Sequence, residues 1–109
     1  MPKVIALITR KPDISRAEFL KHWQEDHPAL VWQLPGLRRY VQNPAVDGYR
    51  DWPFDGAAEL WFDSVGDVAR AFASPEAGPL MQHEDRFIGE LVWFLADETE
   101  TVPEQRSDP

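Results

Sequence analysis

The 109-residue chain contains no cysteine, which excludes disulfide bonds and also excludes thiolates as nucleophiles or metal ligands. It has no apolar run of the length that a membrane span requires, and its first residues, MPKVIALITRK, lack the features of a secretory signal. Basic side chains are scarce. The chain has 11 Lys and Arg residues and 19 Asp and Glu residues, which gives a net charge of −8. Nucleic acids and anionic membranes bind basic surfaces, so neither is expected as a partner. The composition therefore favours one soluble domain in a reducing cytoplasm.

Two sequence periodicities alternate along the chain. Runs rich in β-branched and aromatic residues predict strands, whereas apolar residues at helical spacing predict helices. The predicted strands cover 3–10, 37–45, 57–64 and 89–98, the predicted helices cover 16–34 and 64–74, and 75–87 is a short or broken helical segment. The order βαββαβ indicates an α+β fold, a ferredoxin-like sandwich with helices on one face of a four-stranded antiparallel sheet.

The predicted strands are apolar on both faces, although the helices can cover only one of them. A large exposed apolar sheet face is rare on a soluble monomer. We therefore expect a homodimer in which two sheets pack face to face. The domain is predicted to occupy residues 1–97, and residues 98–109, which are polar and acidic, are expected to form a flexible tail.

His27 is the polar residue that stands out in the first predicted helix. At about 100° per residue it lies on the apolar stripe of Trp23 and Leu30, so it is expected to face the sheet. Pro28 cannot donate a hydrogen bond to the preceding turn, and the resulting bend would open space beside the imidazole. An imidazole in a pocket suits general acid/base work; the alternative is a core histidine bonded to a backbone carbonyl.

The three histidines do not have the spacing expected of a metal site. His22 and His27 are five residues apart, which places them on different faces of an α-helix. Asp26 is likewise expected to point away from His27, and His83 lies in a separate segment. No metal is therefore expected.

Glu59 is a carboxylate inside an apolar predicted strand, GAAELWF. If that face of the sheet is covered, the carboxylate needs an ion-pair partner, and Arg39 or Arg38 on the preceding strand is suitably placed. The alternative is a catalytic carboxyl group whose pKa is raised by burial.

Two segments carry a family resemblance. The first, TRKPDISRAEFLKHWQEDHPALVWQLPGLRRYVQN, contains a lysine–proline turn, Ser15-x-x-Glu18-Phe19, Trp23, His27-x-x-Leu30-Val31, Pro35-Gly36 and Arg39-Tyr40. The second, DGAAELWFDSVGDVARAFASPE, contains Asp55-Gly56 and Glu59-Leu60-Trp61-Phe62-Asp63. Over residues 1 to about 97 the chain resembles the EthD family of dimeric α+β-barrel proteins.

The resemblance implies a homodimeric α+β barrel and a pocket between sheet and helices for a cyclic, often aromatic, oxygenated substrate. Relatives include methylmuconolactone isomerases and fungal polyketide dehydratases or decarboxylases, which use neither a metal nor an organic cofactor. The resemblance also implies that His27 transfers protons and that Tyr40 supplies a pocket hydroxyl group. The other expected pocket residues are Trp23, Leu30, Trp61, His83 and Phe87.

Two functional hypotheses follow. The first is a small cofactor-independent enzyme that acts on a hydrophobic cyclic or aromatic oxygenated metabolite, by isomerase, dehydratase or monooxygenase-type chemistry, with His27 as general acid/base. The second is a non-catalytic homodimeric binding or accessory protein for an apolar metabolite.

Overall fold

The computed structural model describes residues 1–104. Its elements are, in chain order, β1 (Pro2–Arg10), α1 (Arg16–Leu20), the π-helix η1 (Lys21–Asp26), α2 (His27–Val31), β2 (Arg39–Pro44), β3 (Gly56–Trp61), α3 (Val65–Phe72), α4 (Ala77–Glu84) and β4 (Ile88–Asp97). The predicted strands and helices are all present, with ends shifted by a few residues.

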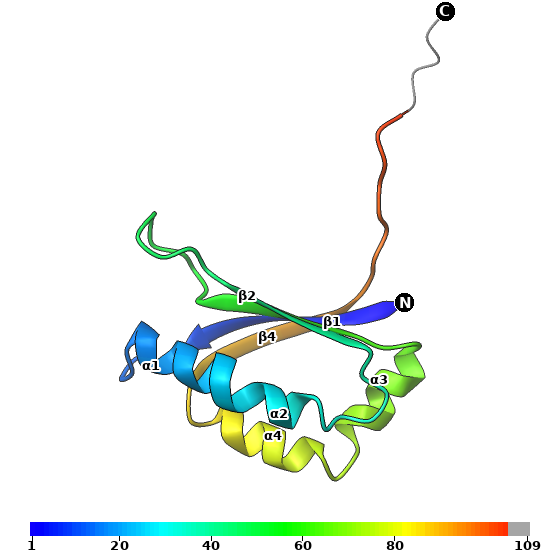
Figure 1. Ribbon diagram of the computed structural model, residues 1–109, viewed down its shortest axis with the longest axis horizontal. Coiled ribbons are helices and arrows are strands. Elements are labelled where there is room, and N and C mark those ends of the chain that lie inside the picture. Colours follow the sequence, from blue (N-terminus) through cyan, green and yellow to red (C-terminus); the bar gives the residue numbers. More distant parts are fainter. Residues whose placement is uncertain (105–109) are drawn as a thin grey trace, which may run out of the picture.

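The four strands form one antiparallel sheet in the order β2-β3-β1-β4. All the helices lie on one side of it (Figure 1). The predicted ferredoxin-like α+β sandwich is therefore confirmed. Because β1 is central, its alternate residues Val4, Ala6 and Ile8 point into the layer between sheet and helices, where they are buried.

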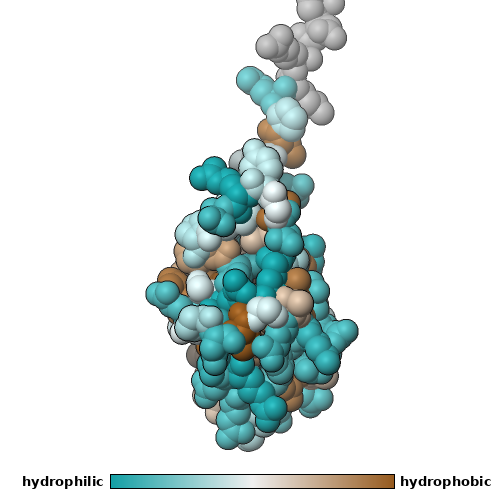
Figure 2. All heavy atoms as spheres, turned by 90° about the vertical axis from the view of Figure 1, so that its left-hand side faces the viewer, coloured by the Kyte–Doolittle hydropathy of each residue, from teal (hydrophilic) through white to brown (hydrophobic). Residues whose placement is uncertain are grey.

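No described element covers the opposite face of the sheet (Figure 1). This face carries apolar side chains from β1 and β4. Ile5 is paired with Phe94 and Leu7 with Val92 across β1 and β4. Phe94 is 51% exposed and Val92 is 50% exposed. By contrast, the end of the molecule in Figure 2 is mostly hydrophilic with scattered hydrophobic spots.

The first predicted helix departs from the α-helical form before Pro28, and not at Pro28 as expected. Residues 21–26 form a π-helix, in which the His27 N–H donates to the carbonyl of His22, five residues back. A π-helix is rare and is frequent at functional sites. Because the wider turn shifts the hydrogen-bonding pattern, no backbone N–H is needed at Pro28. The helical segment therefore continues to Val31.

The π-turn also releases the carbonyl of Trp23, which would accept from the His27 N–H in an α-helix. The side chain of Gln42 on β2 donates to this carbonyl at 2.7 Å. This bond fixes the helical segment over the sheet, with Trp23 and Phe19 fully buried between them.

The predicted domain boundary at residue 97 coincides with the end of β4, and residues 98–104 form neither helix nor strand. The rest of the predicted tail, 105–109, lies outside the described residues. Within residues 1–104 no helix is long and apolar enough to cross a membrane.

Gly56 is required by the close approach of the Trp23 indole. A Cβ atom at Gly56 would stand 2.6 Å from Cη2 of Trp23, which is buried and cannot move aside. Gly56→Ala is therefore expected to lower the free energy of unfolding by about 1–3 kcal/mol. The matched control is Gly78→Ala in α4, where a Cβ meets no atom within 4 Å. Urea denaturation should show little change or a slight gain for the control, and equal stabilities of the two variants would contradict the packing described.

Candidate functional site

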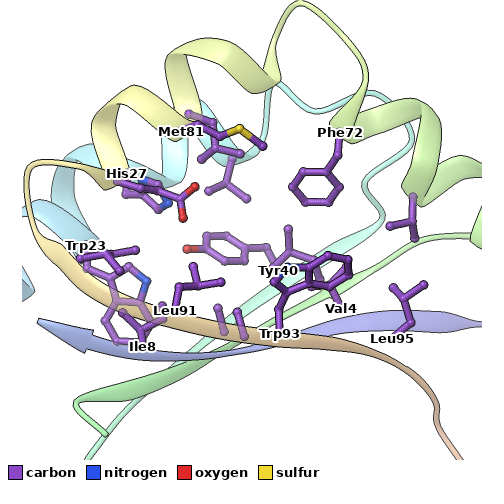
Figure 3. Close-up of a pocket in the computed structure, with 18 of the residues that line it drawn as sticks. Val4, Ile8, Trp23, His27, Tyr40, Phe72, Met81, Leu91, Trp93 and Leu95 are labelled. Atoms are coloured by element: carbon purple, nitrogen blue, oxygen red, sulfur yellow. The ribbon is translucent and has the colours of Figure 1, made fainter.

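A cavity of about 360 Å³ lies between the sheet and the helices. Its wall is almost entirely apolar and comes from all four strands and from η1, α2, α3 and α4. Figure 3 shows the side chains around it, with Trp93 and Leu95 on the β4 side and Phe72 and Met81 on the helix side. The volume is within the range of small-molecule sites. Three titratable side chains line it: His27, Tyr40 and Glu84.

His27 is 5% exposed and lines the cavity at the end where η1 meets α2. Its Nδ1 lies 2.9 Å from Nδ1 of His83, so one of these two rings donates to the other. The ring also packs edge-on against Phe87. Burial, and secondarily the charge of His83, lowers the pKa of His27 to about 4. The imidazole is therefore neutral near pH 7, and Nε2 is the ring nitrogen left for a ligand.

Tyr40 points from β2 into the same cavity (Figure 3). Its hydroxyl oxygen accepts a hydrogen bond from the Gln42 side chain at 2.7 Å, which leaves the hydroxyl proton free to donate. Burial, with a smaller effect from Glu84, raises the pKa of Tyr40 to about 12. Tyr40 is therefore a neutral hydrogen-bond donor at neutral pH, and its hydroxyl group lies in the cavity wall rather than in bulk water.

Trp23 also lines the cavity, as expected from the sequence. Its indole Nε1 is shielded from solvent and makes no hydrogen bond of full geometry among residues 1–104, although it is near enough to the Tyr40 hydroxyl group to lower the pKa of that group slightly. A buried unpaired donor costs about 1–3 kcal/mol. A ligand oxygen in this part of the cavity would satisfy it.

Glu84 is the residue that sequence reasoning missed. It lies near the C-terminal end of α4 and is the one carboxyl group in the cavity wall formed by the described residues. Burial, and secondarily the charge of Asp85, raises its pKa to about 7. The available signal was the stripe of Leu80, Glu84 and Phe87, which places the carboxyl group at a core position of a regular helix.

Four of the expected pocket residues lie outside the cavity wall. His83 and Phe87 pack behind the His27 ring, with ring centroids 5.2 and 5.1 Å away. Leu30 is partly buried against the core. Trp61 is on the opposite face of the sheet, because side chains alternate along β3 and its neighbour Leu60 faces the cavity.

Glu59 also faces away from the cavity, and its ion-pair partner differs from the expected one. Its carboxylate is 2.7 Å from Nζ of Lys3 on β1, whereas Arg39 lies over the Trp61 ring. The hydrogen bond from Lys3 lowers the pKa of Glu59. The Arg39 pairing is therefore corrected to Lys3, and the shift of the Glu59 pKa has the opposite direction to that of the catalytic alternative. Arg38 pairs instead with Asp63.

The π-turn also changes the arrangement of the histidines. His22 lies edge-on to His83 and stacked on Phe87, so it shares the α4 side of the helical segment with His27. The prediction that these two histidines lie on different faces was wrong, because it assumed α-helical spacing through residues 21–26. Among the described residues, His22, Asp26 and His83 form a group with metal-ligating atoms close together.

The fold and the cavity define a small ferredoxin-like protein with an apolar pocket, and comparisons with known proteins agree on the fold. Residues 11–90 match the family model of the EthD domain. An 11.0 kDa protein of the thcB–thcC intergenic region of Rhodococcus erythropolis is 31% identical over 88 residues, which cover 79% of this chain and 84% of that protein. The chain belongs to the EthD family.

Two solved structures share the fold. An EthD family protein of Bacillus halodurans superimposes with a TM-score of 0.77 at 23% identity, covering 91% of this chain and 99% of that one. SnoaB of Streptomyces nogalater, a cofactor-independent oxygenase, superimposes with a TM-score of 0.69 at 19% identity, covering 94% and 97% respectively.

Glu84 and His27 affect stability with opposite signs. The pKa of Glu84 is higher in the folded state, so its contribution to stability falls as the pH rises from about 4.5 to about 7. The pKa of His27 is lower in the folded state, so its contribution is lost as the pH falls from 6.5 towards about 4.

Glu84→Gln removes the titration of the Glu84 carboxyl group and keeps that of His27. The free energy of unfolding of this variant, relative to the natural chain, is expected to rise by on the order of 2 kcal/mol between pH 4.5 and pH 7. Denaturant titrations at a series of pH values measure it. Glu76→Gln, an exposed carboxylate just before α4, is the control and should follow the natural chain. A pH-independent difference for Glu84→Gln would contradict the raised pKa.

Proposed function

We propose that this EthD-family protein is a small cofactor-independent enzyme that transfers protons on a hydrophobic cyclic or aromatic oxygenated metabolite. The observation that carries the proposal is an apolar cavity with three titratable groups, His27, Tyr40 and Glu84, in its wall. Titratable groups with strongly altered pKa values in such a pocket are typical of catalytic sites. The chemistry is of isomerase, dehydratase or monooxygenase type, and a cytoplasmic location is part of the proposal.

Glu84 and His27 are the proposed acid/base pair. General acid/base catalysis is most effective when the pKa of the group lies near the working pH, and the pKa of about 7 for Glu84 meets this condition. His27 stays neutral, and Nε2 either accepts a proton or donates a hydrogen bond, according to the ring tautomer. One group can therefore remove a proton from a ring carbon or hydroxyl while the other returns it elsewhere on the same molecule.

Tyr40 is the proposed orienting group for a substrate oxygen. Because Gln42 already donates to its hydroxyl oxygen, its free proton is available to a carbonyl or phenolate oxygen of the substrate. Such a donor stabilises negative charge that develops on that oxygen when a proton is removed from the adjacent ring. The indole N–H of Trp23 is a second candidate donor in the same wall.

The cavity wall also supports the proposed substrate class. Apart from the groups named above, it offers mainly aliphatic and aromatic side chains, for example Ile8, Leu91 and Phe72. These would bind a fused or substituted ring through apolar contact. Charged metabolites such as sugar phosphates would lose their hydration without compensating partners, so we do not expect them to bind.

A homodimer is the second part of the proposal. The uncovered sheet face carries Ile5, Leu7, Val92 and Phe94 in adjacent positions of β1 and β4. A second copy packed on this face would remove them from water, which is the arrangement of a dimeric α+β barrel. The two half-exposed side chains, Val92 and Phe94, support it.

The catalytic proposal is tested with a panel of bicyclic phenols, hydroquinones and unsaturated lactones. Product formation by the purified protein is followed by chromatography, and oxygen consumption is recorded in parallel. For any compound that is turned over, Glu84→Gln and His27→Gln are each expected to lower kcat by about 100-fold or more. Tyr40→Phe should have a smaller effect, because it removes one hydrogen bond to the substrate.

Glu76→Gln is the control and should keep full activity. Turnover that survives both the Glu84 and His27 substitutions would contradict the acid/base assignment. Binding of panel compounds without any turnover by the natural chain would favour the non-catalytic binding protein instead.

The dimer is tested by sedimentation equilibrium. Phe94→Glu places a charge in the proposed interface and is expected to weaken dimerisation by at least roughly 30-fold. The control is Val46→Glu, at a residue that is 68% exposed and lies between β2 and β3. A natural chain that sediments as a monomer, or a Phe94→Glu dimer as tight as the control, would exclude this interface.

A further inference from the structure

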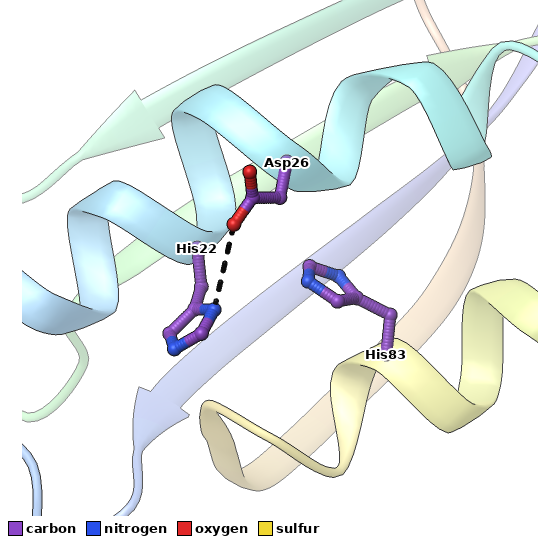
Figure 4. A group of neighbouring side chains, drawn as sticks. All are labelled: His22, Asp26 and His83. Atoms are coloured by element: carbon purple, nitrogen blue, oxygen red, sulfur yellow. Dashed lines mark ion pairs between the residues drawn. The ribbon is translucent and has the colours of Figure 1, made fainter.

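A group of three potential metal ligands lies outside the cavity, between η1 and α4. His22 and Asp26 come from the π-helix and His83 comes from α4 (Figure 4). One ligating atom of each residue lies within 4.8 Å of those of the other two. Nδ1 of His22 and a carboxylate oxygen of Asp26 are 3.7 Å apart.

The π-helix produces this grouping. Its hydrogen bonds join residues five apart, so each turn holds more residues than an α-turn. His22 and Asp26 are four residues apart and would be neighbours in an α-helix as well. The π-turn places this pair on the side that faces His83, which is the side where His27 also meets α4. The cluster therefore depends on the same local distortion that positions the cavity histidine.

The contacts within the cluster are incomplete. Nδ1 of His22 is shielded from solvent and has no hydrogen-bond partner among residues 1–104. An ordinary i,i+4 pair with Asp26 would satisfy it, but 3.7 Å is too long for a hydrogen bond. Asp26 directly precedes α2, but its carboxylate makes no capping hydrogen bond to that helix. A buried unpaired nitrogen beside a free carboxylate points to a missing partner that binds both.

The third ligand has one ring nitrogen to spare. Nδ1 of His83 is engaged with His27, so Nε2 is the nitrogen available to an ion. In Figure 4 the His83 ring lies opposite His22 and Asp26 across the gap between the helices. Histidines that bind metals commonly use their other ring nitrogen in a hydrogen bond that fixes the tautomer, and His27 provides such a bond here.

We propose that His22, Asp26 and His83 bind one divalent transition-metal ion of the zinc type, with water completing the coordination. Two imidazole nitrogens and one carboxylate oxygen suit Zn²⁺, Co²⁺ or Ni²⁺ better than Mg²⁺ or Ca²⁺, which prefer oxygen ligands. Ligands about 2.1 Å from a tetrahedral ion are about 3.4 Å from each other. The exposed Asp26 side chain can rotate to close the remaining distance.

The ion would also determine the state of the cavity histidine. With Nε2 of His83 bound to metal, the His83 proton must be on Nδ1, which then donates to Nδ1 of His27. His27 must in turn keep its own proton on Nε2. Metal binding outside the cavity would therefore fix His27 Nε2 as a hydrogen-bond donor. This proposal does not depend on the proposed enzymatic function.

The metal site is tested by titrating the purified, metal-free protein with Co²⁺, followed by its visible absorption, and with Zn²⁺ by calorimetry. The natural chain is expected to bind one ion per chain. Asp26→Asn and His22→Gln should each weaken binding by at least roughly tenfold, since even the loss of an outer partner costs that much. Glu25→Gln removes an exposed neighbouring carboxylate outside the cluster and should bind like the natural chain.

Asp26 is exposed, so its substitution leaves the fold intact, and circular dichroism verifies this for both variants. Absence of stoichiometric binding by the natural chain, or equal binding by Asp26→Asn, His22→Gln and Glu25→Gln, would overturn the site. The effect on His27 is read separately from the ¹⁵N chemical shifts of its ring. Saturating Zn²⁺ should give the tautomer with the proton on Nε2, and an unchanged mixture of tautomers would overturn the link to the cavity.

Discussion

The site depends on a single backbone hydrogen bond, from the His27 N–H to the carbonyl of His22. This i→i+5 bond makes residues 21–26 a π-helix and leaves the Trp23 carbonyl free for Gln42. Gln42 in turn binds the Tyr40 hydroxyl group. One local distortion therefore connects the helical segment to the sheet, presents His27 to the cavity and brings it into contact with His83. Pro28, which has no N–H to donate, makes this distortion less costly than it would be in an ordinary helix.

The apolar wall of the cavity has different consequences for its three titratable groups. Burial disfavours charge, so it lowers the pKa of His27 and raises the pKa values of Glu84 and Tyr40. At neutral pH this leaves a neutral imidazole, a neutral phenol and a carboxyl group close to half protonation. Such a set can donate, accept and exchange protons without placing a permanent charge beside an apolar ligand. The same environment thus supports both the proposed chemistry and the proposed substrate class.

Much of the fold could be predicted from the sequence, because strand and helix periodicities extend over whole elements. The order of elements and the two apolar faces of the sheet follow directly from such patterns. The position of His27 in the cavity wall also agrees with its place on the apolar stripe. The prediction that Trp61 lines the pocket was wrong. Side chains alternate along a strand, so Trp61 faces away from the cavity because its neighbour Leu60 faces it.

What could not be predicted depends on local geometry and on contacts between distant segments. The α-helical wheel fails through residues 21–26, so it does not show that His22 and Asp26 lie on the same side as His27, where they meet His83. The Lys3 partner of Glu59 depends on the register of β1 against β3, which the sequence leaves open. Glu84 was missed because its segment was interpreted as a broken helix.

The most direct test of the central claim is a nuclear magnetic resonance titration of the Glu84 carboxyl and His27 ring in the natural chain. The account predicts midpoints near pH 7 and near pH 4 respectively, and ordinary midpoints close to 4.5 and 6.5 would contradict it.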